Sequence, residues 1–215
     1  SILYIPFIQL LYTMRLRRLR QKTLDAFNKR TPIFDKFHHM KAGTPVGGGL
    51  LIIIITTVLF PIVLLGMRYF WIPITSVYPM GSEIKILLFT FVSFGALGLL
   101  DDIKKTFLWA KSNFFGLRLR HKLLLEIALA SIIGFWLVYD LKINIFYMPF
   151  LGVIELGWWY IPLAVFIIIA FANAFNITDG LDGLASGVLM IALMAFWFLS
   201  ASILDTSLSV FIALW

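Results

Sequence analysis

The sequence predicts an all-α fold, a polytopic bundle of about six or seven transmembrane helices. Hydrophobic residues make up 61% of the 215 residues and charged residues only 13%. A water-soluble domain of this size has too much surface to cover with so few polar residues. Several apolar runs also approach the roughly 20 residues that a helix needs to cross the hydrocarbon core. In lipid, a helix is the open-chain form that satisfies its own backbone hydrogen bonds.

The apolar runs give the order of the spans. We expect spans near residues 1–13, 48–67, 85–100, 123–139, 160–175 and 186–204, and a seventh that begins near residue 207. The sequence opens inside an apolar run without methionine, stops inside another, and has no small-residue signal-peptide cleavage site. We therefore expect residues 1–215 to form a single integral-membrane domain that is an incomplete piece of a longer protein. No disulfide is expected, because the sequence contains no cysteine.

The basic residues predict the orientation of these spans. Of the eighteen Lys and Arg residues, nine lie between residues 15 and 41 and six between residues 104 and 122. The positive-inside rule therefore places the first, third and fifth connections in the cytoplasm. The net charge of +7 is explained by this topology and by attraction to anionic membrane lipid. Nucleic-acid binding is not expected, because the charge is spread over two juxtamembrane loops.

The outer connection between the fourth and fifth spans has the composition of a β-hairpin. Its β-branched and aromatic residues flank Pro149 and Gly152, which predicts a short hairpin near residues 143–156 that lies at the membrane interface. Trp158, Trp159 and Tyr160 would form an aromatic belt there. An irregular loop with the same aromatic anchors is the alternative.

An aspartate pair marks the end of the third span. Asp101 and Asp102 follow the apolar run directly, and adjacent carboxylates repel each other in a partly dehydrated site. A divalent cation or a basic partner relieves that repulsion, so the pair suggests a metal or cationic site. The alternative is a simple helix end at which Lys104 and Lys105 are solvated partners.

The segment "NAFNITDGLDGLASG" places polar residues directly after the fifth span. Asn176, Asp179 and Asp182 are spaced by three, which predicts neighbouring positions along one side of a helix. Gly180 and Gly183 would allow a bulky ligand to approach the backbone. Two Asp-Gly turns in an ordinary loop are the alternative.

A third polar cluster, "KAGTPVGGG", precedes the second span. Backbone amides of a glycine-rich turn beside Lys41 can hold phosphate oxygens, although the Walker pattern is missing. The alternative is a glycine-rich entry that packs closely on a neighbouring helix. Together the three cytoplasmic clusters suit a phosphate, a divalent cation and an amide-bearing ligand, and Mg²⁺ bridging carboxylates and a diphosphate would combine them.

Four motifs carry a family resemblance: "KAGTPVGGG", "LLDDIKK", "GLRLRHK" and "NAFNITDGLDGLASG". They resemble those of the phospho-N-acetylmuramoyl-pentapeptide transferases, within the polyprenyl-phosphate N-acetylhexosamine-1-phosphate transferases, and the resemblance covers essentially the whole chain. Thr178 favours this branch over sister enzymes that more often carry "IDGLDGLA". The resemblance implies transfer of phospho-MurNAc-pentapeptide from UDP-MurNAc-pentapeptide to undecaprenyl phosphate, which gives lipid I and UMP with Mg²⁺. It also implies a site on the cytoplasmic side of the bacterial plasma membrane, and it allows a homodimer.

The resemblance also implies roles for individual residues. Asp101 and Asp102 match the family's catalytic aspartates, with Asp101 the better candidate to orient or deprotonate the lipid phosphate. Asp102 and Asp182 would contact the metal, whose main family ligand is expected beyond residue 215. The expected substrate-binding residues are Lys41, Thr44, Lys122, Asn173, Asn176, Asp179, Gly180, Leu181 and Asp182.

Two departures and two rivals remain. Val46 stands where the family usually has threonine, and the family's later aspartate and histidine-rich motif are not in this sequence.

The nearest rival is a sister enzyme that uses UDP-GlcNAc or another UDP-N-acetylhexosamine. A transporter is the rival from another class. It predicts carboxylates at mid-membrane depth and internal repeats, whereas we expect the acidic groups to cluster at the cytoplasmic interface and the sequence shows no repeat.

Overall fold

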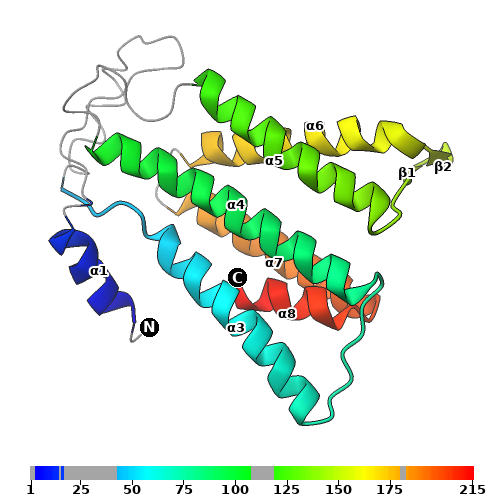
Figure 1. Ribbon diagram of the computed structural model, residues 1–215, viewed down its shortest axis with the longest axis horizontal. Coiled ribbons are helices and arrows are strands. Elements are labelled where there is room, and N and C mark those ends of the chain that lie inside the picture. The colour runs from blue at the N-terminus through cyan, green and yellow to red at the C-terminus, as the bar shows by residue number, and fades with distance from the viewer. Residues whose placement is uncertain (1–2, 15, 17–42, 108–118, 180–182) are drawn as a thin grey trace. The chain divides into compact units, whose positions relative to one another are not determined.

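The computed structural model describes residues 3–14, 16, 43–107, 119–179 and 183–215 (Figure 1). Its helices are α1 (Tyr4–Thr13), α3 (Gly49–Tyr69), α4 (Met80–Phe107), α5 (Leu119–Tyr139), α6 (Tyr160–Thr178), α7 (Leu184–Ser202) and α8 (Thr206–Leu214). The strands are β1 (Ile145–Met148) and β2 (Gly152–Glu155), and a 3-10 turn η2 (Gly157–Trp159) precedes α6. The predicted helical membrane fold with one short β-hairpin is confirmed.

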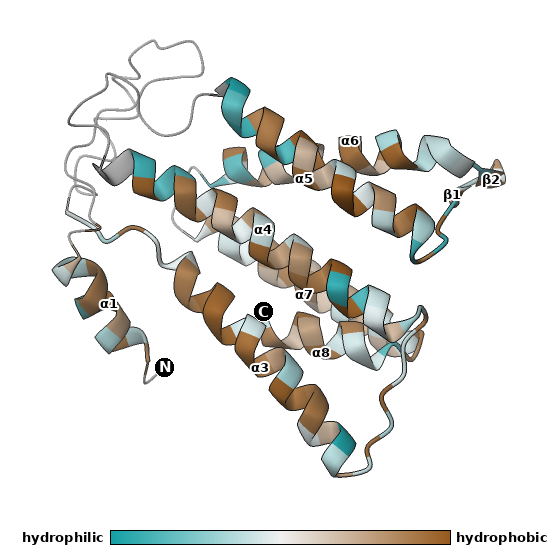
Figure 2. Ribbon diagram, viewed as in Figure 1, coloured by the Kyte–Doolittle hydropathy of each residue, from teal (hydrophilic) through white to brown (hydrophobic). Residues whose placement is uncertain are grey.

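Five of these helices are long and apolar enough to cross a membrane, namely α3, α4, α5, α6 and α7. They correspond to the second to sixth predicted spans, so the chain is a multi-pass membrane protein. Helices α1 and α8 have ten and nine residues, fewer than a crossing requires. Figure 2 shows hydrophobic residues along most of α3 and hydrophilic residues at the carboxyl end of α4 and the amino end of α5.

Helix α4 is longer than the predicted span of residues 85–100. It begins at Met80, where the amides of Ser82 and Glu83 both donate to the carbonyl of Pro79, and it continues through Phe107. Hydropathy marks the part of a helix that lies in lipid, whereas charged residues can extend that helix into water. The prediction therefore found the membrane part of α4 and missed both ends.

The chain divides into two compact units, residues 1–54 with 93–125 and residues 55–92 with 126–215. In the first unit α3 and α4 approach closely at Gly95, because a Cβ there would overlap the side chain of Ile53. Gly47 has a φ of +94°, and a Cβ on it would lie within 4 Å of Leu11 and Leu99. Gly47 of the glycine-rich entry is thus packed against neighbouring helices, as the packing alternative expected, whereas a Cβ on Gly48 or Gly49 would meet nothing within 4 Å.

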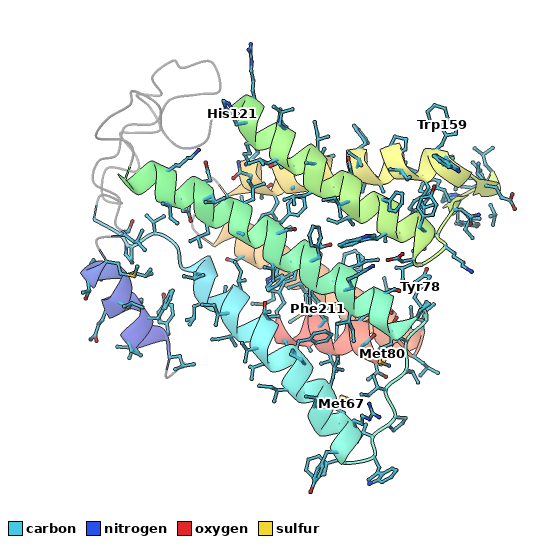
Figure 3. All side chains as sticks on the ribbon, in the orientation of Figure 1. Met67, Tyr78, Met80, His121, Trp159 and Phe211 are labelled. Carbon is cyan, nitrogen blue, oxygen red and sulfur yellow. The ribbon has the colours of Figure 1, made fainter. Side chains whose placement is uncertain are left out.

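The core of the second unit forms where α8 meets α3 and α4. Phe60, Leu64 and Phe211 are buried there, and the rings of Phe60 and Phe211 meet edge to face with centroids 5.1 Å apart. Phe91 packs against the same Phe211 ring at 5.5 Å (Figure 3). Such pairs add to the stabilisation from apolar burial.

A buried polar network lies between α4 and the turn from α7 to α8, also within the second unit. Asp205 caps the amino end of α8 by accepting from the amide of Leu208 at 3.0 Å. The Ser207 hydroxyl lies 2.5 Å from Glu83 Oε1 and 3.1 Å from Asp205 Oδ1. Ser76 bonds the other oxygen of Glu83, and the amide of Val77 donates to Asp205 Oδ2 at 3.3 Å. The two buried carboxylates are therefore held by hydroxyl and amide donors from two separate segments, the loop before α4 and the start of α8.

The outer connection is a β-hairpin, as predicted. Strands β1 and β2 pair antiparallel, with Ile145 opposite Glu155 and Met148 opposite Gly152. The turn contains Phe150 and Gly152, both at positive φ. Trp158 and Trp159 follow in η2 and are each 75% exposed, which suits an aromatic anchor at the membrane surface (Figure 3).

The orientation of the spans can be tested with single cysteines, because these 215 residues contain none. We expect His121→Cys, at the amino end of α5, to be protected from a membrane-impermeant thiol reagent in intact cells. Leu151→Cys, in the exposed hairpin turn beyond the other end of α5, should be labelled. The 21 residues of α5 extend about 30 Å, enough to separate the two positions by a membrane. Labelling of His121→Cys alone would reverse the predicted topology.

Candidate functional site

The aspartate pair lies on the carboxyl-terminal part of α4. Asp101 and Asp102 are both half-buried, and both take part in polar or electrostatic interactions. Because α4 continues to Phe107, the pair projects from the side of a helix, which contradicts the alternative of a simple helix end. Successive helical residues point about 100° apart around the axis. The two carboxylates therefore face different neighbours and can serve different chemical roles.

Lys122 lies in the first turn of α5, in the same compact unit as the aspartate pair. It is half-buried, and the exposed Arg120 and His121 precede it. The first turn of α5 carries no acidic residue. Positive side chains at a helix amino end oppose the helix dipole and are normally unfavourable there. An anion bound at this end would be attracted by the side chains and by the helix dipole.

Thr44 belongs to the same unit and is exposed in the segment before α3. The preceding Gly43 has a φ of +93°, so the backbone turns at this point. The amide of Val46 donates to the carbonyl of Leu16 at 2.8 Å, which fixes the segment to the residues after α1. Lys41, the predicted phosphate ligand of this motif, lies outside the described residues.

The asparagines of the long polar motif belong to α6 in the second unit. Asn173 and Asn176 lie in its last two turns, the first half-buried and the second exposed. The helix ends at Thr178, and Asp179 follows with a non-helical ψ of 40°. The prediction that Asn176, Asp179 and Asp182 continue along one helix side is therefore wrong at Asp179.

The described residues on either side of residues 180–182 are not helical. Gly183 has a φ of +83° and directly precedes α7, which is the backbone expected of the Asp-Gly turn alternative. The exposed Asp179 thus lies at the start of a connection between two transmembrane helices. Gly180, Leu181 and Asp182, also predicted to bind substrate, are outside the described residues.

The structure adds Glu126, a residue that none of the four sequence motifs contains. Glu126 of α5 is 2% exposed, and its Oε2 atom accepts a hydrogen bond from Asn173 Nδ2 at 2.7 Å. The same nitrogen donates to the carbonyl of Ile169 at 3.0 Å. The expectation that acidic groups cluster at the cytoplasmic interface thus omitted Glu126, which lies within a candidate membrane span. Its sequence context, "LLLEIALA", was the available signal, since a carboxylate inside a span is a functional candidate by default.

The candidate site has side chains of the chemical type that binds a magnesium ion, namely carboxylates. Among the residues that the structure describes, no group of three or more His, Cys, Asp or Glu side chains could hold a metal. Mg²⁺, however, is usually held by one or two carboxylates, and substrate phosphates and waters complete its octahedron. Asp101 and Asp102 supply such carboxylates, and Asp182 lies outside the described part of the chain.

Comparison with known proteins gives a family match and full-length relatives. The glycosyl transferase family 4 model matches residues 84–215. A relative from Caldanaerobacter subterraneus subsp. tengcongensis is 34% identical over 181 residues, and one from Thermodesulfovibrio yellowstonii is 36% identical over 165. One from Aquifex aeolicus is 35% identical over 181 residues. All three are named phospho-N-acetylmuramoyl-pentapeptide-transferase.

These alignments cover 83%, 73% and 82% of this chain, respectively. They cover only 51%, 40% and 44% of the three relatives. The chain therefore spans about half the length of the curated relatives it matches.

Proposed function

This chain belongs to glycosyl transferase family 4, and we propose that it is part of an enzyme that transfers a sugar phosphate to a polyprenyl phosphate in the bacterial plasma membrane. The proposed donor is UDP-MurNAc-pentapeptide and the proposed acceptor is undecaprenyl phosphate. The products would be lipid I and UMP, as part of peptidoglycan synthesis. The names of the relatives and the four sequence motifs support these substrates.

One structural observation carries the proposal. The half-buried carboxylates of α4 and the cationic first turn of α5 belong to one compact unit of a membrane protein. Phosphoryl transfer between two anionic substrates depends mainly on positioning and on neutralising their charge. The first turn of α5 supplies positive charge and backbone amides for a phosphate, and the aspartates supply oxygen ligands and a proton acceptor.

Each of these residues has its own role in the proposed reaction. An oxygen of the lipid phosphate attacks the phosphorus atom that carries the sugar, and the bond between that phosphorus and the bridging oxygen of UMP breaks. Asp101 orients the attacking phosphate and accepts its proton where one is present. The family resemblance assigns a phosphate of the donor to Lys122 and the nucleotide to Asn176 and Asp179. Mg²⁺, when bound, supplies charge neutralisation at the diphosphate, and Asp102 is the described residue proposed to hold it.

The substrate can be tested with the full-length protein in detergent. We expect UMP to be released from UDP-MurNAc-pentapeptide only when undecaprenyl phosphate and magnesium are both present. The matched control replaces the donor by UDP-N-acetylglucosamine at the same concentration. A faster reaction with that control donor would identify the protein as a sister transferase. Release without any lipid phosphate would contradict transfer altogether.

A further inference from the structure

Helices α5 and α6 pack together in the second unit, and two contacts fix their register. Near one end, a Cβ on Gly134 would lie 3.4 Å from both the Cγ2 atom and the carbonyl oxygen of Ile161. Toward the other end, Glu126 and Asn173 form the 2.7 Å hydrogen bond described above. Figure 1 shows α5 crossing α6 at an angle. The hydrogen bond is thus the polar connection between α5 and the part of α6 that leads into the predicted nucleotide site.

The two partners of Asn173 determine which way its amide group faces. Nδ2 lies 2.7 Å from a carboxylate oxygen and 3.0 Å from a backbone carbonyl oxygen. Both of these oxygens are hydrogen-bond acceptors. If the amide group were flipped, Oδ1, which is also an acceptor, would face two acceptors and could bond neither. The nitrogen is therefore committed to Glu126 and Ile169. Among the described residues no partner of Oδ1 is present, and this oxygen is the part of the side chain left to bond a ligand.

We infer that Glu126 is a positioning residue that fixes Asn173 so that it offers a hydrogen-bond acceptor to the donor substrate. The inference rests on the proposed function, in which Asn173 belongs to the nucleotide-sugar site. An N–H or O–H group of the UDP-sugar is the chemical class of partner that this oxygen would bond. Glu126 itself is 2% exposed and acts through Asn173.

The test compares two replacements of Glu126 in the full-length protein. Glu126→Met keeps the side-chain volume and removes the acceptor, whereas Glu126→Gln keeps an acceptor oxygen and removes the charge. In Glu126→Met the Asn173 amide still has the Ile169 carbonyl as an acceptor, which limits the cost to the fold. We expect Glu126→Met to raise the KM for UDP-MurNAc-pentapeptide about tenfold, as for the loss of one hydrogen bond, with kcat changed less than about threefold. Glu126→Gln should stay within about threefold of the natural KM.

Two further variants separate positioning from a general structural role. Ser131→Ala is the matched control, because the Ser131 hydroxyl bonds only the Ile127 carbonyl of its own helix among the described residues, and its KM should be unchanged. Asn173→Leu should raise KM as much as Glu126→Met, and the double variant should be no worse than Asn173→Leu alone.

The outcomes distinguish the inference from the proposed function. Three outcomes would overturn the inference and leave the proposed function standing. They are a normal KM in either Glu126→Met or Asn173→Leu, additive effects in the double variant, and a loss confined to kcat. If Glu126→Met does not fold, a normal KM in Asn173→Leu still overturns the inference. No transfer by the unaltered protein with either UDP-sugar would overturn the proposed function and the inference with it.

Discussion

Asp101→Asn and Asp102→Asn are each expected to lower turnover of the full-length protein by about 10²-fold or more, the lower range for a positioned acid–base group. Asparagine keeps the size of the side chain and removes its charge and its proton-accepting oxygen. The half-buried pair on α4 is the group of carboxylates that the proposed reaction uses most directly. The measurement is the initial rate of UMP release at saturating substrates and magnesium.

The control is Asp140→Asn, which changes a carboxylate at the end of α5 that is paired with Lys85. Both partners of that ion pair are partly exposed, so its loss should affect stability little and the rate not at all. Near-normal rates in both Asp101→Asn and Asp102→Asn would remove the pair from the active site.

The two aspartate variants should also differ from each other. Adjacent side chains on a helix point in different directions, so Asp101 and Asp102 need not serve the same ligand. If Asp102 holds the metal, Asp102→Asn should raise the magnesium concentration that gives half-maximal rate, and Asp101→Asn should leave that concentration unchanged. A magnesium titration of both variants reads this difference directly.

The sequence predicted the fold well because hydropathy and charge act locally. Five spans and their order follow from runs of apolar residues, and the hairpin follows from Pro149 and Gly152 between β-branched residues. The ends of α4 were missed because they contain polar and charged residues, and a hydropathy criterion counts such residues as lying outside the span. The end of α6 was missed because the sequence fits two structures. The spacing of Asn176 and Asp179 fits a helix, and a turn at Gly183 also fits the sequence.

The polar contacts inside the second unit were harder to predict. Glu126 and Asn173 are 47 residues apart, and Glu83 and Ser207 are 124 apart, so a single sequence does not indicate these pairs. Asp205 is different, because Asp-Thr-Ser before an apolar run is a recognisable helix start. Its role as the cap of α8 was available from the sequence, whereas its connection to Val77 was not.

Asp205→Ala is expected to reduce the free energy of unfolding by about 2 to 3 kcal/mol, the sum of a lost helix cap and of buried donors left without an acceptor. Asp205 is 2% exposed and accepts from the amides of Leu208 and Val77. Its replacement also removes one partner of the Ser207 hydroxyl, which is fully buried. The loss should therefore loosen the docking of α8 on α3 and α4, where Phe211 completes the core.

Asp205→Asn is the matched variant, because asparagine caps a helix about as well as aspartate does. Its oxygen can still accept from Leu208, so its loss of stability should stay below about half that of Asp205→Ala. Unfolding of the full-length protein in detergent, followed by circular dichroism during titration with a denaturing detergent, measures both values. Equal losses in the two variants would mean that the charge of Asp205, and not its acceptor geometry, holds the α7–α8 turn against α4. A negligible loss in Asp205→Ala would show that the buried network contributes nothing to the stability of this end of the bundle.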